Sequence, residues 1–432
     1  MHFARGCHTG PFFIQQEPPS LAFLASHIAG QPPGPAGHRP ARLVSVPYGT
    51  RVIISPNDPW CLWRDHRPPT DYVHLDSASA GRSSVGTLRA VAAHAEREAV
   101  AGGYVAQAEA APALERGRAA LGGLLGVEPG GVVFVQNAST ALGVLLAVWP
   151  LDAGDTVAVV RSEWGPNLTA FGNRGLKVTE LAVHGDGTVD LDALRRFVAD
   201  TPPALVHLTQ VASHRPLVQP VAEAAAICRA AGVPLWVDAA QALGHADTAF
   251  GADAIYATSR KWLTGPRGVG VLAVAGPWWD RLRIRASELQ LANVPEGASR
   301  VMLLESGEGH VAGRVGLCAA VSQHLEAGPA EVRRRLAEVG LRTRGALAGV
   351  PGWKVVGGIA APSAITALLP AAGQDVTAVR ARLLARHKIV TSAALPARAP
   401  REMSGPLLRI SPHVDCTPQD LQTLSRALAE TA

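Results

Sequence analysis

Between residues 131 and 274 the chain repeats one arrangement, in which a short apolar run is followed by a turn and then by helical spacing. The apolar runs are 131–135, 156–160, 204–208, 234–237, 254–257 and 269–274, and helical spacing is clearest at 139–148 and 221–231. Runs without polar alternation are typical of strands that are buried on both faces by helices. The sequence therefore predicts an α/β fold with a large, mostly parallel sheet.

The pattern changes in the last third of the chain. A charged amphipathic helix is expected at 328–347, strands at 353–356 and 363–369, and helices at 375–387 and 418–429. This mixture predicts a smaller α+β domain. We expect residues 101–290 to form the large domain, residues 291–432 the small C-terminal domain, and residues 59–100 a segment that joins the small domain.

Residues 1–58 differ from the rest of the chain. They are rich in proline, glycine and histidine, most densely at 31–38, and show little helical or strand period. We expect a disordered N-terminal extension, produced by an upstream start codon or kept as a regulatory tail. The N-terminus lacks the basic-then-apolar order of a signal peptide, and no apolar run reaches the roughly 18 residues that suggest a membrane span.

The formal charge of +5 does not indicate a nucleic-acid partner. Of the 40 basic residues only Lys177, Lys261, Lys354 and Lys388 are lysines, and the arginines form no basic stripe with interleaved aromatics. The five cysteines contain no Cys-x-x-Cys pair, which argues against a zinc site. Their odd number and wide spacing favour the reducing cytoplasm over a disulfide framework.

Two polar side chains follow apolar runs directly. Asp238 ends the run at 234–237, and Lys261 comes shortly after the run at 254–257. In open α/β sheets ligands bind at the carboxyl ends of the strands. A chain that otherwise uses arginine keeps a primary amine here, as Schiff-base chemistry requires. Each residue alone also fits a simpler reading, Asp238 as a turn cap and Lys261 as a surface charge.

Two further segments occupy comparable positions. Ser139 and Thr140 lie between a predicted strand and a predicted helix, where backbone N–H groups and hydroxyls can bind a phosphate or simply cap the helix. Trp164 follows the run at 156–160, where an aromatic ring can stack on a planar cofactor or pack beneath a loop. Neither segment is specific alone, so their order along the chain carries the argument.

The order of these four segments, with Lys261 23 residues after Asp238, resembles the class V aminotransferase family of pyridoxal 5′-phosphate (PLP) enzymes. This family has fold type I and includes the cysteine desulfurases. The resemblance covers about residues 71–430, and residues 238–241 and 258–268 carry its most specific part. It implies a PLP cofactor, an amino-acid substrate and a homodimer.

The resemblance also implies a role for each matched residue. Lys261 would hold the cofactor as a Schiff base and then act as a base, while Asp238 would pair with the pyridine nitrogen. Trp164, where many relatives have His, would stack on the ring, and Gln241 would reach the ring 3′-oxygen. Ser139, Thr140, Thr258 and Arg260 would hold the phosphate, and Arg409 the substrate α-carboxylate, with Gln210 and His214 facing cofactor and substrate.

The choice of reaction depends on a loop. Cysteine desulfurases need a catalytic cysteine shortly before the carboxylate-binding arginine, and residues 391–404 contain none, since Cys416 lies beyond Arg409. Residues 74–78, 102–105, 163–168, 211–215 and 238–244 instead resemble the C–S lyases of ergothioneine biosynthesis. That resemblance implies β-elimination from hercynylcysteine S-oxide, which gives a sulfenic acid on the way to ergothioneine, with pyruvate and ammonia. We also expect an aromatic face to contact the quaternary ammonium through cation–π attraction; Tyr104 is a candidate for this contact and otherwise fits a position in the core or in the lining of the site.

Other readings stay open at this stage. A cysteine desulfurase, an aminotransferase or a kynureninase-like enzyme would use the same fold on a different amino acid. A non-catalytic regulator would need a DNA-binding domain, and residues 1–58 show no helix-turn-helix pattern. A protein that has lost PLP would have no need of both Asp238 and Lys261.

Overall fold

The structure is a computed structural model that describes residues 42–45, 51–54, 59–284, 300–305, 308–371 and 373–431. The chain divides into two units, residues 1–58 and 59–432. In the first unit β1 (Arg42–Ser45) and β2 (Arg51–Ile54) pair antiparallel. The remainder of the expected N-terminal extension lies outside the described residues. All other elements belong to the second unit.

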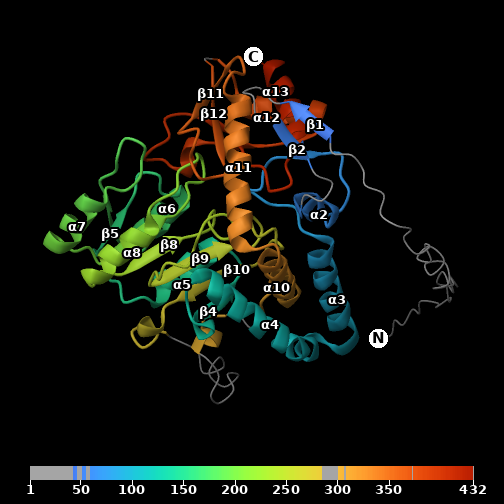
Figure 1. Cartoon of the computed structure of the whole chain (residues 1–432). Helices are drawn as coiled ribbons and strands as arrows, with labels where there is room; N and C mark the ends of the chain where they lie inside the picture. The colour runs from blue at the N-terminus through green and yellow to red at the C-terminus, as the bar shows by residue number, and fades with distance from the viewer. Residues whose placement is uncertain are drawn as a thin grey trace, which may run out of the picture. The chain divides into compact units, whose positions relative to one another are not determined.

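A seven-stranded sheet forms the centre of the second unit (Figure 1). Its order is β4 (Val132–Val135), β10 (Gly270–Val274), β9 (Ala254–Thr258), β8 (Leu235–Asp238), β7 (Leu205–Thr209), β5 (Thr156–Val159) and β6 (Lys177–Glu180). Only β10 runs antiparallel to its neighbours, and every other pair is parallel. The predicted α/β fold with a mostly parallel sheet is confirmed.

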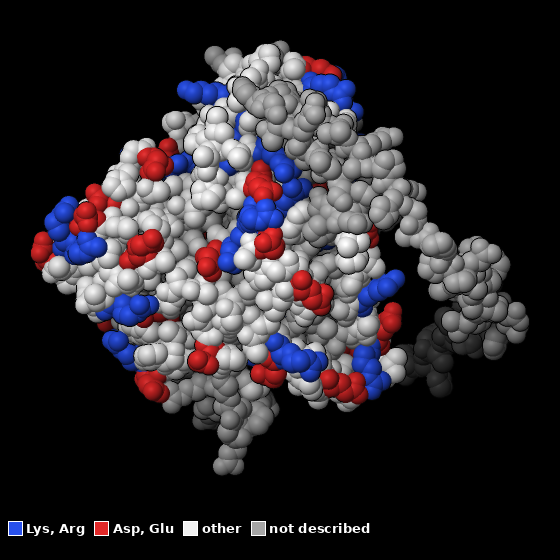
Figure 2. Space-filling model, viewed as in Figure 1, with Lys and Arg blue, Asp and Glu red and all other residues white. Residues whose placement is uncertain are grey.

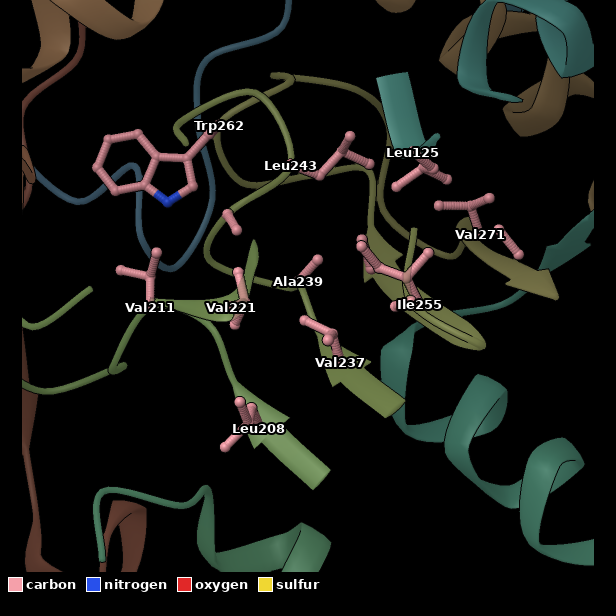
Figure 3. Packing of buried hydrophobic residues seen from close by; sticks show 14 of the residues in the cluster. Leu125, Leu208, Val211, Val221, Val237, Ala239, Leu243, Ile255, Trp262 and Val271 are labelled. Carbon is pink, nitrogen blue, oxygen red and sulfur yellow. The ribbon is translucent and has the colours of Figure 1, made fainter. Parts of the chain in front are cut away.

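Helices cover both faces of this sheet. One hydrophobic cluster joins the sheet to α4 (Gly103–Leu125), α7 (Leu191–Asp200), α8 (Val221–Ala230) and α10 (Val311–Glu326). Figure 3 shows part of it, where Val237 and Ile255 of the sheet share the core with Leu125 of α4. The second cluster lies on the opposite face, beneath α5 (Ala138–Val148) and α6 (Gly165–Asn173). The central strands are therefore buried on both sides, as their continuous apolar sequence predicts.

The C-terminal part contains a four-stranded antiparallel sheet of β11 (Trp353–Val356), β12 (Thr366–Pro370), β15 (Leu407–Ile410) and β14 (Ser392–Ala394). This sheet shares a hydrophobic cluster with α11 (Pro329–Leu347), α12 (Val376–His387) and α13 (Pro418–Ala429). β3 (Val73–His74) pairs in parallel with β13 (Ile389–Val390), so the segment before the large sheet contacts C-terminal elements. The segment from Pro59 also contains α2 (Pro59–Asp65) and α3 (Val85–Ala101).

Some elements differ from the sequence expectation. Helix α4, for which the sequence analysis gave no range, begins at Gly103 and continues through the exposed Pro112, with Ala106 packed into the core. β6 was not predicted, since Lys177 and Glu180 are exposed and the strand lies at the edge of the sheet. Edge strands need not be apolar, so their sequence pattern is weak.

The charged side chains are interspersed on the face shown in Figure 2. On α11, for example, Arg334 contacts both Glu331 and Glu338. This arrangement is typical of a solvated helix surface. Within the described residues, no helix is both long and apolar enough to cross a bilayer.

Candidate active site

A cavity of about 600 Å³ opens at the carboxyl ends of the central strands. The strand register places Asp238 beside Thr209 of β7 and Tyr256 of β9. The N-terminus of α5 supplies another wall. The lining includes Ala78, Ser79, Gln136, Asn137, Ser139, Trp164, Asn167, Thr209, Ser213, Asp238, Gln241, Thr258, Arg260, Lys261, Arg267, Gly268 and Arg398. The sequence segments that seemed weak alone therefore meet at one edge of the sheet.

Asp238 is a buried carboxylate whose two oxygens both accept hydrogen bonds. Oδ1 accepts from the backbone N–H of Ala240 at 2.8 Å, and Oδ2 accepts from Nδ2 of Asn167 at 3.0 Å. Burial raises the pKa of Asp238, while the positive charge of Lys261 and the hydrogen bond from Asn167 oppose that rise. Both protein partners are donors, so this carboxyl group is arranged to act as an acceptor.

Lys261 follows β9 and lines the same cavity. Burial lowers the pKa of its amine to about 7, Asp238 opposes this shift, and the arginines at 260, 409 and 398 reinforce it. No hydrogen bond to its Nζ occurs among the residues that the structure describes. An amine with this pKa is neutral in about half of the molecules at pH 7, and in that form it can act as a nucleophile toward a carbonyl group or as a base.

Gln241 and Trp164 occupy different walls of the cavity. Gln241 donates from Nε2 to the carbonyl oxygen of Ala78 at 2.9 Å and accepts from Nε1 of Trp262 at 2.9 Å. An amide nitrogen carries two hydrogens, so one remains for a ligand oxygen. The Trp164 ring lies 5.5 Å from the guanidinium carbon of Arg398, a cation–π distance.

The turn before α5 presents the N-terminus of that helix to the cavity. Asn137 caps this helix by accepting the backbone N–H of Thr140 at 2.9 Å, and Ser139 lines the cavity. The turn lies close to β10, since a Cβ atom at Gly270 would be 2.9 Å from Cα of Asn137. Thr258 and Arg260 line the same cavity. Thr140, the fourth predicted phosphate ligand, is not among the lining residues.

Arg409 lies behind the cavity wall and is fully buried. Its Nη1 donates to the carbonyl oxygen of Ser213 at 2.7 Å, and Nη2 donates to Oδ1 of Asp76 at 3.1 Å and to Oγ of Ser79. Among the described residues its Nε has no hydrogen-bond partner. Ser79 and Ser213 line the cavity, so Arg409 is one side chain away from it.

Three predicted substrate residues lie elsewhere. Gln210 is buried and donates to the backbone oxygen of Asp247. His214 donates from Nε2 to Oε2 of Glu402 at 2.7 Å, and it lines a separate cavity of about 680 Å³. Tyr104 on α4 is 81% exposed and is not a lining residue. The structure does not bring these three side chains into the cavity that contains Lys261.

Sequence reasoning did not assign a role to Asn167 or Arg398, both of which line the cavity. It also passed over Glu163 and His207, which are buried beside Asn167. A signal existed for His207, since it interrupts the apolar run at 204–208. Arg398 gave no pattern, because its loop reaches the cavity only through tertiary packing.

These residues fit the PLP cofactor that the sequence resemblance implies. A buried acceptor at Asp238 suits a protonated ring nitrogen, an unpartnered amine at Lys261 suits the aldehyde carbon, and Trp164 offers an aromatic face. Ser139 at the start of α5, together with Thr258 at the end of β9 and Arg260 just after it, suits the phosphate. The donor set thus matches each functional group of the cofactor.

Comparisons with known proteins give the same assignment. A family model described as aminotransferase class-V matches residues 73–424. The probable hercynylcysteine sulfoxide lyase of Mycobacterium tuberculosis (strain CDC 1551 / Oshkosh) is 48% identical over 366 residues, which are 85% of this chain and 92% of that protein. A cysteine desulfurase of Dickeya dadantii (strain 3937) is 28% identical over 268 residues, covering 57% of this chain and 65% of that protein.

Solved structures show the same fold at low sequence identity. An apo cysteine desulfurase from Thermococcus onnurineus NA1 superposes with a TM-score of 0.74 at 19% identity, over 85% of this chain and 96% of its own. A mutant of C-DES with glycine covalently linked to its PLP cofactor also has a TM-score of 0.74, at 18% identity, over 84% of this chain and 97% of its own. The predicted fold type I is confirmed.

Proposed function

The chain belongs to the aminotransferase class-V family, and from this we propose that it is a PLP-dependent C–S lyase that cleaves hercynylcysteine S-oxide. The observation that carries the proposal is the 48% identity to a probable hercynylcysteine sulfoxide lyase over 92% of that protein's length. The cavity with Lys261 and Asp238 supplies the matching chemistry. The products would be a sulfenic acid, pyruvate and ammonia.

When bound, PLP withdraws electrons from Cα of the amino acid and so makes its proton removable. Lys261 would hold the cofactor, and its amine, with a pKa of about 7, would be suited to take the Cα proton. Asp238 would accept a hydrogen bond from the ring nitrogen and favour its protonated form. Trp164 would stack on the ring, and the free amide hydrogen of Gln241 would donate to the ring 3′-oxygen.

The bond between Cβ and the sulfoxide sulfur then breaks, and its electron pair leaves with sulfur as a sulfenate. Proton uptake converts this group to the sulfenic acid, while the three-carbon fragment takes up water and yields pyruvate and ammonia. We propose that Arg398 stabilises the negative oxygen of the leaving group, because its guanidinium lines the cavity beside Trp164. Arg409, which lies one side chain behind this wall and has an unpartnered Nε, would attract the α-carboxylate by its charge across Ser79 and Ser213.

The remaining predicted residues take indirect roles in this proposal. His214 and Arg215 both contact Glu402, whose loop also carries Arg398, so His214 supports the loop rather than the substrate. Gln210 supports the adjoining wall through Asp247. Thr140 would assist the phosphate through the start of α5. Each of these roles is inferred from the direction of the side chain and from its hydrogen-bond partner within a single subunit.

We further propose a cytoplasmic homodimer. Val100 and Tyr104, at the corner of α3 and α4, are 80% and 81% exposed, and apolar side chains of this kind favour coverage by a partner. In such a dimer Tyr104 would be free to contact the quaternary ammonium of a substrate bound by the other subunit. The free thiols at Cys61, Cys228, Cys318 and Cys416 fit a reducing compartment.

The desulfurase alternative fits the loop less well. Residues 391–404, all of them described, contain no cysteine, and Cys416 is buried with a pKa that burial raises well above its ordinary value. A thiol in that state is a poor nucleophile. Cysteine persulfide chemistry therefore has no evident sulfur acceptor near Lys261.

The purified holoenzyme with hercynylcysteine S-oxide tests the function directly. Pyruvate and ammonia should form in equal amounts with this substrate, whereas free cysteine should give neither alanine nor persulfide. Alanine formation from cysteine would identify a desulfurase. Bound PLP without pyruvate from the sulfoxide would retain the family and exclude the proposed substrate.

A further inference from the structure

Three ionisable residues lie on a face of the sheet that is otherwise apolar. Glu163 follows β5, His207 lies in β7 and Tyr256 lies in β9, and all three are 0% exposed. The apolar residues of this face, beneath α5 and α6, form one hydrophobic cluster, and Phe171 of α6 packs edge-on against the His207 ring at 5.1 Å. Burying such groups is costly unless each is hydrogen-bonded.

These residues form a continuous hydrogen-bonded chain. Tyr256 Oη lies 2.9 Å from Nε2 of His207, and Nδ1 of His207 lies 2.9 Å from Oε2 of Glu163. The other oxygen of Glu163, Oε1, accepts from the backbone N–H of Trp164 at 2.8 Å, from Asn167 at 2.9 Å and from Thr209 at 2.6 Å. Because an ionised carboxylate only accepts, Nδ1 of His207 must carry a hydrogen.

Asn167 connects this chain to Asp238. Its Nδ2 donates to Oε1 of Glu163 at 2.9 Å and to Oδ2 of Asp238 at 3.0 Å. Both amide hydrogens are therefore directed at carboxylates, and a flip of the amide would place its oxygen against two negative groups. Glu163 thus fixes the orientation in which Asn167 is a donor to Asp238.

We propose that Glu163, held by His207 and Tyr256, is a positioning residue that locks Asn167 as a donor, keeps Asp238 as an acceptor, and so maintains the proton on the cofactor's ring nitrogen. Glu163 does not line the cavity and does not touch the cofactor, so it acts through Asn167 and Asp238. It also places a second negative charge behind Asp238, which favours a proton between Asp238 and the ring.

The charge balance around Glu163 supports this role. Burial would raise the pKa of Glu163, yet His207, Thr209 and Asn167 together lower it below its ordinary value. The carboxylate therefore stays ionised although it lies next to Asp238. A purely structural site could bury apolar side chains here at less cost.

The sharpest test is a pair of substitutions at His207, which does not line the cavity. His207→Asn keeps a donor near the position of Nδ1, whereas His207→Leu has almost the same size and no donor. Without that donor Glu163 keeps only its uncharged donors on Oε1, so the buried carboxylate takes up a proton more readily. Both proteins are loaded with nitrogen-15-labelled PLP, and the ring-nitrogen NMR signal is followed with pH.

We expect the ring nitrogen of the Leu variant to lose its proton about one pH unit lower than in the wild type, which is a roughly tenfold fall in the ratio of protonated to unprotonated ring nitrogen at a given pH. The Asn variant should remain close to the wild type. Equal behaviour of the two variants would overturn the proposal.

A second pair of substitutions tests the proposal without changing His207, in case the variants at that position do not fold. Glu163→Gln removes the charge and retains the shape, and Glu305→Gln does the same at a buried carboxylate that also accepts a backbone N–H, from Phe134 at 2.7 Å. Only Glu163→Gln should move the ring-nitrogen titration. If both variants lose thermal stability and neither moves that titration, Glu163 is structural alone.

Discussion

Two buried glutamates of this chain are surrounded in opposite ways. Glu305 lies between Arg118 at 2.5 Å and Arg314 at 3.4 Å, so two full positive charges compensate it. Glu163 has His207 and three uncharged donors, and a hydrogen-bonded Asn167 separates it from a second carboxylate. We expect the ion pairs of Glu305 to hold α4, α10 and β4 together. The surroundings of Glu163 instead keep a negative charge buried beside the cavity of Lys261.

The two surroundings of the glutamates show which part of the fold serves stability and which part serves catalysis. Removing a buried carboxylate from between two arginines leaves their charges uncompensated, which lowers the free energy of unfolding strongly. The two neighbouring carboxylates Glu163 and Asp238, close to the amine of Lys261, lower the free energy of unfolding. Such groups are typical of functional sites where a proton must be held. Substitutions in the Glu305 region should therefore change unfolding, and substitutions around Lys261 should change turnover.

The largest effect is expected for Lys261→Ala. Loss of the amine removes both the cofactor attachment and the base, and general-base loss alone lowers turnover by about 10²–10⁴-fold. Thermal stability of the apo protein should not fall, because burial already disfavours the charged amine. Pyruvate release and melting temperature are measured together, with Lys388→Ala, an exposed lysine paired with Asp71, as control. Retained turnover would remove Lys261 from the mechanism.

The same lysine predicts how the stability of the apo protein depends on pH. Its pKa falls from an ordinary value of 10.5 to about 7 on folding, chiefly through burial. Between these two values the unfolded chain binds more protons, so the free energy of unfolding should rise with pH across this window. The cost of burying the charged Lys261 amine is fully present below about pH 7. Denaturant titrations of wild type and Lys261→Ala should show this slope only in the wild type, and equal slopes would contradict the assignment.

Glu305→Gln sharpens the comparison from the other side. It leaves Arg118 and Arg314 without their shared carboxylate, and breaking a buried pair in this way costs about 3–5 kcal/mol. Urea denaturation should show this loss, while turnover per folded molecule stays at the wild-type level. A fall in turnover with unchanged stability would mean that the two glutamates do not differ as described.

The sequence predicted the strand-end residues Asp238 and Lys261 better than the hydrogen-bonded chain behind them. Apolar runs place Asp238 and Lys261 at strand ends, so the edge that carries the site follows from period and order alone. Asn167, Glu163 and His207 interact through the register of β5, β7 and β8, which pairs Val159 with His207 and Thr209 with Asp238. Such register is a tertiary property, and a single sequence does not reveal it.

The substrate residues show the same limit. Gln210 and His214 lie in the predicted stretch, yet their side chains bond to Asp247 and Glu402 instead of entering the cavity. Arg398 enters it from a loop with no regular period. Backbone placement is thus readable from pattern, whereas side-chain direction depends on partners that are distant in sequence.

The smallest of these effects is expected at Arg398. If its guanidinium stabilises the departing sulfenate, Arg398→Ala removes one charge-assisted hydrogen bond, worth about 1.5–3 kcal/mol, or roughly 10- to 100-fold in kcat/KM. Arg398→Lys should recover part of this loss, because it restores the charge without the planar fork. Arg401→Ala provides the control, since this arginine lies in the same loop but pairs with Glu180 outside the cavity. Steady-state pyruvate release from hercynylcysteine S-oxide measures all three variants. Equal losses for Arg398→Ala and Arg401→Ala would show that the loop matters for folding and that Arg398 has no part in leaving-group stabilisation.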